Sequence, residues 1–396
     1  MRTRRASYGA PAQLISGMQK RRLRSSLAPV GEIRPQQASC AKRARCSSHQ
    51  SCEEERRSDC CFDKLPDDVV LSILVWLSSR ADSPKDLLSI MPVCKRLKRL
   101  ASNAMVLSKA SEGALTVKAS QWCDAASSYL STCAEAGNSE ACFTLGMIRF
   151  YCLMERKAGL ELVGRAASGS HTGALHALGV IHFNGSGGSR ADKNLKAGVH
   201  LCARAAALGH VDAMRELGHC LQDGYGASKN VLQGRRLILE ANVREASIAT
   251  KCLKSKLSID HGVNKLKLKT DSLFSMYKLL HSRNCSLLSD FGCSVFPPTI
   301  HIAHKFLLAW FHLRPLPVGL RLCSHANCGR PETRKHEFRR CSACGCVNYC
   351  SRACQALDWK LQHKLHCAST TRWQNRAFVG LPRRHGPLYM DDSRDQ

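Results

Sequence analysis

Hydrophobic residues recur at three- and four-residue spacing between residues 62 and 107, which is the period of a helix with one buried face. In the first stretch they are Val69, Val70, Ile73, Leu74 and Leu77. Pro66, followed by two aspartates, predicts the start of one helix, and Ser83 with Asp86 predicts the start of a second. Pro92 interrupts the second helix, and apolar positions after it predict a third. The pattern predicts a three-helix unit that is too small to bury all its apolar faces alone.

The phrase Ala-x3-Leu-Gly occurs three times between residues 120 and 245, with its glycines 33 and 39 residues apart. These glycines are Gly146, Gly179 and Gly218. Small residues at helical spacing let two helices approach closely, so the repeat predicts stacked helical hairpins, an α-solenoid. The run Gly185-Ser186-Gly187-Gly188 lacks the spacing of a phosphate-binding loop, and we interpret it as a turn between helices.

The other segments are assigned by their composition. Residues 1–61 are basic and lack apolar periodicity, which is typical of a disordered tail. Residues 246–290 are rich in Lys and Ser, and we expect a flexible insertion there. Residues 291–319 contain an apolar connector helix between prolines, and residues 369–396 form a polar tail. The expected fold class is mainly α.

The net charge of +28 at pH 7 is spread along the chain. Such a surplus favours acidic partners without specifying one, and a solvated basic surface explains it equally well. The first 25 residues lack an apolar signal region, and the longest apolar run near the end, Phe306 to Leu313, is too short to span a membrane. We therefore expect a reducing compartment, the nucleus and/or the cytoplasm, where clustered cysteines are metal ligands before they are disulfides.

One segment, residues 323–367, carries metal-binding chemistry. Its spacing is C-x4-C-x12-C-x2-C-x5-C-x3-C-x8-H-x3-C. Eight thiolate and imidazole ligands suffice for two tetrahedral zinc ions, and four protein ligands per ion make a closed, structural site. The predicted ligands are Cys323, Cys328, Cys341, Cys344, Cys350, Cys354, His363 and Cys367. The alternative is a cysteine-rich segment without metal. The other candidates in the segment, expected to be bystanders, are Cys346, His325, His336 and His366.

The end of this segment resembles the MYND zinc-finger family, through Tyr349-Cys350-x3-Cys354-Gln355-x2-Asp358-Trp359-x3-His363-Lys364-x2-Cys367. The resemblance implies interleaved sites. The first ion is then bound by Cys323, Cys328, Cys350 and Cys354. The second is bound by Cys341, Cys344, His363 and Cys367. The first pair is C-x4-C here, where many members have C-x2-C. MYND fingers generally bind short, often proline-containing peptides and are not catalytic. We expect this finger to fold around its own metals, independently of the repeats.

Residues 62–108 resemble an F-box, through Leu65-Pro66-Asp67-Asp68-Val69, Ile73-Leu74, Asp86-Leu87-Leu88 and Val93-Cys94-Lys95-Arg96. F-boxes dock on a Skp-type adaptor of cullin–RING ubiquitin ligases. The predicted contact residues are Leu65, Pro66, Ile73 and Leu74. The connector between the first two helices is longer than in most F-boxes. Residues 120–245 resemble SEL-like repeats, which are related to tetratricopeptide repeats. An F-box, these repeats and a C-terminal finger in this order resemble a plant F-box/MYND protein family.

Three kinds of function follow from these resemblances. The first is a substrate adaptor of a ubiquitin ligase, whose repeats and finger bind target proteins. The second is a ubiquitin-independent scaffold or transcriptional co-regulator in the nucleus. An enzyme is the third, because MYND fingers occur in SET-domain methyltransferases. No cofactor motif, His-Glu-x2-His or Gly-x-Ser-x-Gly elbow occurs, so we expect no catalysis. We expect neither a membrane nor nucleic acid as a partner.

Overall fold

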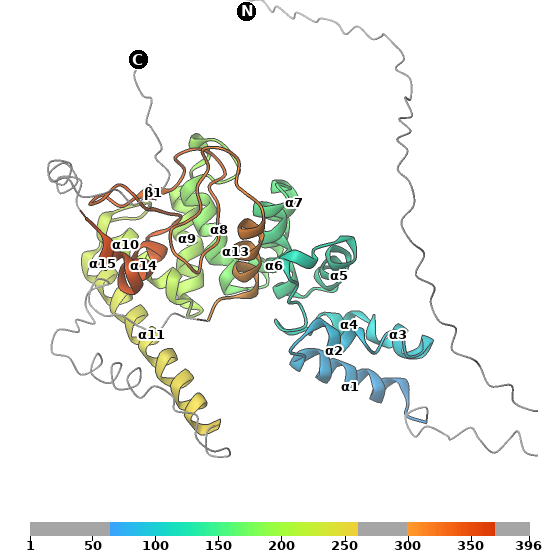
Figure 1. The fold of residues 1–396 in the computed structure, drawn as a ribbon. Helices are drawn as coiled ribbons and strands as arrows, with labels where there is room; N and C mark the ends of the chain where they lie inside the picture. The colour runs from blue at the N-terminus through green and yellow to red at the C-terminus, as the bar shows by residue number, and fades with distance from the viewer. Residues whose placement is uncertain (1–63, 260–298, 369–396) are drawn as a thin grey trace, which may run out of the picture. The chain divides into compact units, whose positions relative to one another are not determined.

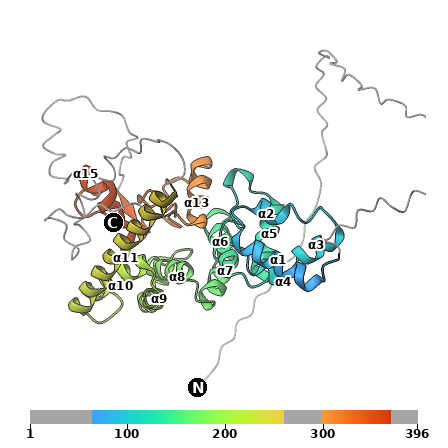
Figure 2. The same ribbon diagram turned by 90° about the horizontal axis from the view of Figure 1, so that it is seen from below.

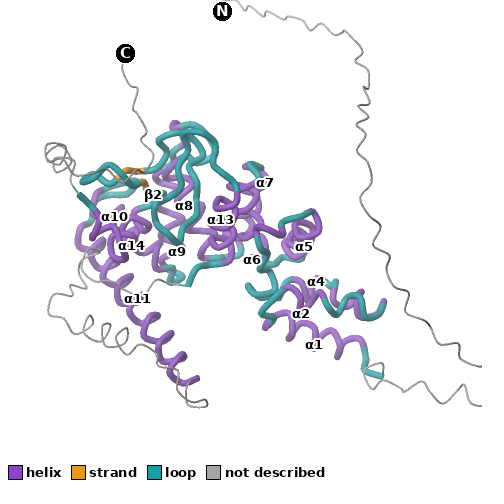
Figure 3. The backbone as a smooth tube through the Cα atoms, in the orientation of Figure 1, coloured by secondary structure: helices purple, strands orange, loops and turns teal. Residues whose placement is uncertain are grey.

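The computed structural model describes residues 64–259 and 299–368, and in these residues the secondary structure is mainly α-helical (Figures 1 and 3). This confirms the predicted fold class. The predicted N-terminal tail, the polar C-terminal tail and residues 260–290 of the predicted insertion lie outside the described residues. None of the helices that the structure describes combines the length and apolar character needed to cross a membrane.

The N-terminal unit contains the three predicted helices and a fourth, short one. They are α1 (Asp67–Arg80), α2 (Pro84–Leu88), α3 (Lys95–Ala101) and α4 (Ala104–Leu107). Ser83 caps α2 as predicted, because its side chain and that of Asp86 form a reciprocal capping box. Pro66 occupies the cap position of α1, one residue before the first helical residue.

The N-terminal unit packs on the first hairpin of the repeats, as its small core requires. Val70 and Leu74 of α1 are buried in a hydrophobic core that continues into the repeats. The buried Asn138 side chain donates hydrogen bonds to the carbonyl oxygens of Leu107 (3.1 Å) and Ala110 (2.9 Å). Paired backbone groups at this junction fix the end of the unit against the start of the second repeat helix.

The repeats form three helical hairpins, and a longer helix packs on the last of them (Figures 1 and 2). The hairpin helices are α5 (Asp124–Glu135), α6 (Ser139–Met147), α7 (Arg156–Ser168), α8 (Thr172–Asn184), α9 (Leu195–Ala207) and α10 (Val211–Asp223). Short helical turns lie at η1 (Ala119–Gln121), η2 (Ile148–Cys152) and η3 (Arg190–Asp192). The long helix is α11 (Val231–Ile259), which follows a Gly-rich turn after α10.

The repeated alanine marks the start of the second helix in each hairpin. Three residues before it stands a side chain that accepts a hydrogen bond from the alanine backbone N–H. The pairs are Asn138 with Ala141 (2.9 Å), His171 with Ala174 (3.0 Å) and His210 with Ala213 (3.2 Å). An equivalent cap in every hairpin explains why the phrase recurs at this point.

The repeated glycine lies where two backbones meet. A Cβ on Gly146 would lie 3.0 Å from the carbonyl oxygen of Gly159, and one on Gly218 would lie 2.9 Å from that of Gly234. Gly179 faces Gly198 in the same way, at 3.3 Å. Each contact joins the second helix of one hairpin to the first helix of the next element. Any side chain there would push the hairpins apart.

Helix α11 corrects one predicted boundary. It continues to Ile259, so the flexible insertion does not begin at residue 246. Residues 246–259 contain neither Gly nor Pro and are rich in Ala, Leu and Lys, which are good helix formers. Weak hydrophobic periodicity led us to expect a flexible segment, but helix propensity alone is sufficient to extend a helix already nucleated on α10.

The connector helix α13 (Ile302–Leu313) packs against η1, α6 and η2, and it lies beside α6 in both views (Figures 1 and 2). The ring of Phe306 meets that of Trp122 at a centroid distance of 5.3 Å. After α13 comes the C-terminal segment with β1 (Arg339–Arg340), β2 (Asn348–Tyr349), α14 (Arg352–Asp358), η5 (Trp359–His363) and α15 (Lys364–His366). The two strands pair antiparallel, with Arg339 opposite Tyr349.

Glu140 holds α13 to the repeats. Its carboxylate lies 2.9 Å from Nε2 of His171, the cap of α8, and 2.8 Å from Nε2 of His301, the cap of α13. Burial raises the pKa of the Glu140 carboxyl, but the two histidines outweigh burial and lower the pKa to about 2. The ionised carboxylate therefore stabilises the fold above the ordinary pKa of 4.5, and this contribution is lost as the pH falls towards 2.

We predict that Glu140→Gln lowers the free energy of unfolding at pH 7 by about 2 kcal/mol, because hydrogen bonds to a charged partner are lost. The difference from wild type should shrink as the pH falls from about 4.5 towards 2. Chemical denaturation at a series of pH values measures it. Glu161→Gln on the exposed side of α7 controls for loss of one negative charge. A Glu140→Gln difference that stays constant across this pH range would contradict the account.

Candidate metal centre

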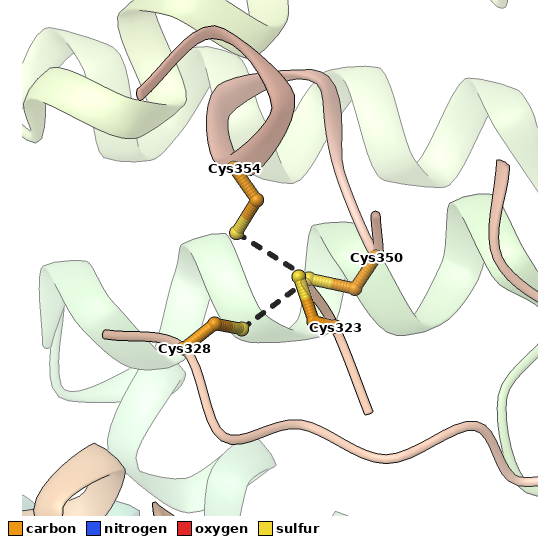
Figure 4. Close-up of side chains that lie close together, drawn as sticks. All are labelled: Cys323, Cys328, Cys350 and Cys354. Carbon is orange, nitrogen blue, oxygen red and sulfur yellow. Dashed lines mark hydrogen bonds between the residues drawn. The ribbon is translucent and has the colours of Figure 1, made fainter. Parts of the chain in front are cut away.

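The first metal cluster joins four cysteines from three parts of the C-terminal segment (Figure 4). Cys323 and Cys328 come from the loop after α13, Cys350 follows β2 and Cys354 lies in the first turn of α14. All four are buried, and their side chains point towards one another. The sulfur of Cys350 lies 3.6 Å from those of Cys328 and Cys354.

The second cluster contains Cys341, Cys344, His363 and Cys367. The sulfur of Cys341 lies 3.9 Å from that of Cys367, and the sulfur of Cys344 lies 3.6 Å from Nε2 of His363. The structure thus groups the first cysteine pair with the third, and the second pair with the fourth. This is the interleaved arrangement that the resemblance to MYND fingers implies.

These distances fit tetrahedral zinc. With Zn–S bonds of about 2.3 Å and a Zn–N bond of about 2.0–2.1 Å, tetrahedral angles place two sulfurs about 3.8 Å apart and a sulfur about 3.6 Å from the imidazole nitrogen. Four soft or borderline donors per cluster leave no open position for substrate. The segment is therefore a finger with two structural zinc ions, as predicted.

Local hydrogen bonds arrange the ligands. The Gly345 N–H donates to the carbonyl of Cys341 (2.8 Å), which closes a tight turn between the ligand pair and β2, and Gly345 has φ +66°, where a side chain would be strained. Ser351 caps α14 by accepting the N–H of Cys354 (3.1 Å). The buried Tyr349 hydroxyl donates to Asp358 (2.6 Å), which fixes α14 against β2.

The buried Arg330 guanidinium supplies positive charge to the first cluster. Its Nη1 lies 3.7 Å from the Cys350 sulfur and 3.9 Å from that of Cys328. Burial lowers the pKa of Arg330, but these sulfurs outweigh burial and hold it well above the ordinary value. Because four thiolates around one Zn²⁺ carry a net charge of −2, a buried cation beside them reduces the electrostatic cost of burial.

In the second cluster, one thiol is prepared for metal binding. Burial raises the pKa of Cys341, but the backbone N–H of Cys344 and the ring of His363 outweigh burial and lower it to about 6. A thiolate is the form that binds zinc, so Cys341 is ready for the metal at neutral pH.

The finger does not stand apart from the repeats, contrary to our expectation. Asn184 at the end of α8 donates its side-chain N–H to the carbonyl of Cys350 (2.8 Å). The Gly187 N–H donates to Thr333 (2.7 Å), and the Ala353 N–H donates to the buried Glu216 of α10 (3.0 Å). The Gly-rich run after α8 is therefore a turn between helices, and it is also a docking site for the finger.

A buried ionic network adds to this attachment. Nζ of Lys360 in η5 lies 3.2 Å from the Glu245 carboxylate and donates to Asn242 (2.6 Å), both on α11. The same carboxylate pairs with the fully buried Arg215 of α10 at 2.8 Å. Removing one partner of a buried ion pair typically costs about 3–5 kcal/mol. Sequence reasoning missed Lys360, Glu245 and Arg330, since a charged side chain gives no sign of burial in the sequence, whether it lies in a helix or, like Arg330, in a loop.

The bystander residues do not join either cluster. His336 and His366 are exposed, and the exposed Cys346 points its sulfur towards the Cys344 carbonyl. His325 is buried, but the metal clusters do not include it. Trp359 meets the ring of His363 edge-on, with 5.7 Å between the ring centroids.

The described residues contain one further group of potential metal ligands, Glu140 with His171 and His301. Nδ1 of His171 accepts the Ala174 N–H (3.0 Å), and Nδ1 of His301 accepts the Ala303 N–H (3.1 Å). A neutral imidazole that binds metal through Nε2 carries its proton on Nδ1, where it would face those N–H groups. This chemistry favours a hydrogen-bonded cluster, not a metal site.

The predicted F-box contact residues differ in exposure. Pro66 and Ile73 are exposed, Leu65 is half-buried, and its carbonyl accepts a hydrogen bond from Arg96. Leu74 is only 3% exposed and packs in the core of the unit, so it cannot contact a partner as expected. We expected Ile73 and Leu74 to share one binding face, but the side chains of adjacent helical residues project about 100° apart.

Two exposed apolar residues that we did not select extend the surface of Ile73. They are Val69 and Trp76. Val69, Ile73 and Trp76 follow the helical spacing of four and three residues and therefore lie on one face of α1. Their exposed fractions are 40%, 42% and 59%. The helical spacing of these three residues is visible in the sequence. The apolar residues on the buried face of α1 made this second, exposed face hard to recognise.

We predict two zinc ions per full-length chain by elemental analysis. His363→Ala should retain about one ion after dialysis against a mild chelator, because the second cluster loses a ligand. Cys346→Ser, a change two residues after the ligand Cys344 but outside both clusters, should retain two. The His363→Ala variant should also lose amide protection in α10 and α11, because Lys360 lies beside His363. Two retained ions, or unchanged protection of these helices, would contradict the assignment.

Models of three families match this chain: an F-box-like model at residues 62–108, plant tetratrico peptide repeats at 114–197 and the MYND finger at 323–367. Among solved structures, a Sel1 repeat protein from Oxalobacter formigenes is 22% identical. The match covers 32% of this chain and 95% of that protein, with a TM-score of 0.27, too low for a comparison of folds.

Two curated proteins are similar over most of their length. F-box protein At1g67340 from Arabidopsis thaliana is 52% identical over 339 residues, 84% of this chain and 88% of that protein. F-box protein At5g50450 from the same plant is 49% identical over 314 residues, 79% of this chain and 86% of that protein. The chain therefore belongs to their family, plant F-box proteins with SEL-like repeats and a C-terminal MYND-type zinc finger.

Proposed function

We propose that this chain is the substrate-recognition subunit of an SCF-type, cullin–RING ubiquitin ligase. Its F-box unit docks on a Skp-type adaptor, and its repeats and finger bind target proteins. In this proposal the chain supplies binding and no catalytic step, in agreement with two zinc sites that four protein ligands each would close. It acts in the nucleus and/or the cytoplasm.

The apolar face of α1 carries the proposal. Val69, Ile73 and Trp76 are exposed, although the same helix buries Val70 and Leu74. Contiguous exposed apolar side chains usually mark an interface, and aromatic residues contribute strongly to binding energy. Asn138 joins the end of the N-terminal unit to the repeats. The repeats therefore support the unit, and the apolar face of α1 is held in a fixed position on it.

The repeats and finger supply the second half of the proposal. Because hydrogen bonds and a buried ionic network join them, a target would meet one continuous surface and not two mobile modules. Proline-containing peptides at the finger, typical of the MYND family, are the first targets to examine. A basic surface on a chain of charge +28 favours acidic targets as well.

We predict that Ile73→Ala with Trp76→Ala abolishes co-purification with a Skp-type adaptor. Each central interface residue contributes about 2 kcal/mol or more, so the pair should weaken binding by roughly 1,000-fold. Helix content and zinc stoichiometry should not change, because both side chains are exposed. Co-purification from co-expressed, tagged proteins measures the effect.

The matched control is Leu232→Ala with Val243→Ala, which removes two exposed apolar side chains from α11. This variant should bind the adaptor as wild type does. If the wild-type chain never captures a Skp-type adaptor, the proposal is wrong, and the ubiquitin-independent scaffold or co-regulator becomes the better account.

A further inference from the structure

A cavity of about 570 Å³ lies where the turn after α8, helix α10 and the finger meet. Phe183 and Tyr225 line it from the repeats, and Phe338 lines it from the finger. Pockets of about 300–1,000 Å³ are large enough for a ligand or a short peptide segment. Of the eight zinc ligands, only Cys350 borders this space, so the cavity is separate from the metal chemistry.

Basic side chains dominate the lining. The cavity is lined by six basic side chains and by two acidic ones, Glu216 and Glu337. The six are Arg190, Lys193, Arg334, Lys335, Arg339 and Arg352. They come from four segments: η3 with its following residue, the loop before β1, β1 itself and α14. The folded chain therefore gathers this charge from distant parts of the sequence.

The two acidic residues offset only part of this charge, because they face six basic side chains. Both carboxylates also accept hydrogen bonds inside the protein. The fully buried Glu337 carboxylate accepts hydrogen bonds from the Thr333 N–H (2.5 Å) and hydroxyl (2.6 Å). Glu216 is 4% exposed and accepts the N–H of Ala353 at 3.0 Å. Glu337 therefore stabilises a loop within the finger, and Glu216 attaches the finger to α10.

Two of the basic residues also have internal partners. Arg334 donates to the carbonyl of Gly185 (2.8 Å), and Arg352 lies 2.5 Å from the Asp223 carboxylate. The side chains of the other four form no hydrogen bond or ion pair with any residue in the described parts of the chain. These four are Arg190, Lys193, Lys335 and Arg339.

Like charges crowd one another around the cavity. Burial lowers the pKa of the Lys193 amine, and the nearby Arg334 and Arg190 lower it further. An anion placed among these groups would relieve the repulsion, and a recessed site with one sign of charge attracts such a ligand.

The shape of the cavity favours an extended peptide segment over a single small anion as its ligand. A second cavity of about 170 Å³ shares Arg339 and Arg352 with the first and continues towards His219 and Gln355. A free phosphate or sulfate would occupy only one part of this space. An extended segment could place acidic groups against the basic residues and an apolar side chain against the aromatic lining.

We propose that this basic cavity binds a short acidic segment of a target protein, whose carboxylate or phosphate groups pair with Lys193, Lys335 and Arg339. This site adds a class of target, acidic segments, to the proposed function. Calling the bound segment a target rests on that function. Binding itself needs no Skp-type adaptor. A chain that binds the peptide but not the adaptor would therefore retain the site and lose the ligase assignment.

The test is fluorescence anisotropy with the full-length chain. The probe is a labelled, glutamate-rich peptide of about twelve residues with one central phenylalanine, and a phosphoserine version forms a second arm. We expect binding of both, and a loss of about tenfold or more for Lys193→Glu with Arg339→Glu, because like charges then oppose the ligand. Unchanged zinc content and melting temperature show that the variant is folded.

The matched control is Lys157→Glu with Lys196→Glu, which makes the same change in net charge at exposed sites on α7 and α9. Its affinity should remain within about twofold of wild type, since only general attraction is reduced. Equal losses in both variants would show non-specific attraction and overturn the proposal. Stronger cavity-dependent binding of a single-stranded oligonucleotide or of a polyproline peptide would also overturn it.

Discussion

Close contact between backbones at paired glycines is the constraint on which this structure depends. Gly146, Gly179 and Gly218 each lie against the next element where a side chain would not fit. This contact fixes how consecutive hairpins stack, and so it fixes the turn that follows each hairpin. The turn after α8 is then placed to accept the finger, through Asn184 and Gly187.

Zinc and the repeats stabilise each other through this arrangement. The metal clusters hold Cys350, Cys354 and His363, and residues next to these ligands bind α8, α10 and α11. Binding free energy of a structural zinc site is available to folding, and here the buried contacts transmit it into the last hairpin. In the proposed adaptor function, this construction would hold the target surface at a fixed position relative to the F-box unit, which suits the transfer of ubiquitin to a bound target.

Sequence reasoning identified the parts whose chemistry is local. Ligand spacing gave the eight zinc-binding positions, and the phrase Ala-x3-Leu-Gly gave the hairpins, because caps and close contacts repeat with the chain. It failed where the outcome depends on distant contacts. Leu74 was placed on a binding face that the core buries, and Lys360 and Glu216 gave no sign of joining the finger to the repeats. Helix α11 continues beyond residue 245, where we expected it to end, because the helix propensity of residues 246–259 extends it without hydrophobic periodicity.

Docking of α1 on a Skp-type adaptor can be measured by hydrogen exchange of the full-length chain, with and without the purified adaptor. We expect added protection in α1 to α3 when the adaptor is present. Protection in α6 to α10 and in the finger should not change, because the proposed function keeps these surfaces free for targets. Protection that appears in the finger or the repeats while α1 is unaffected would contradict it.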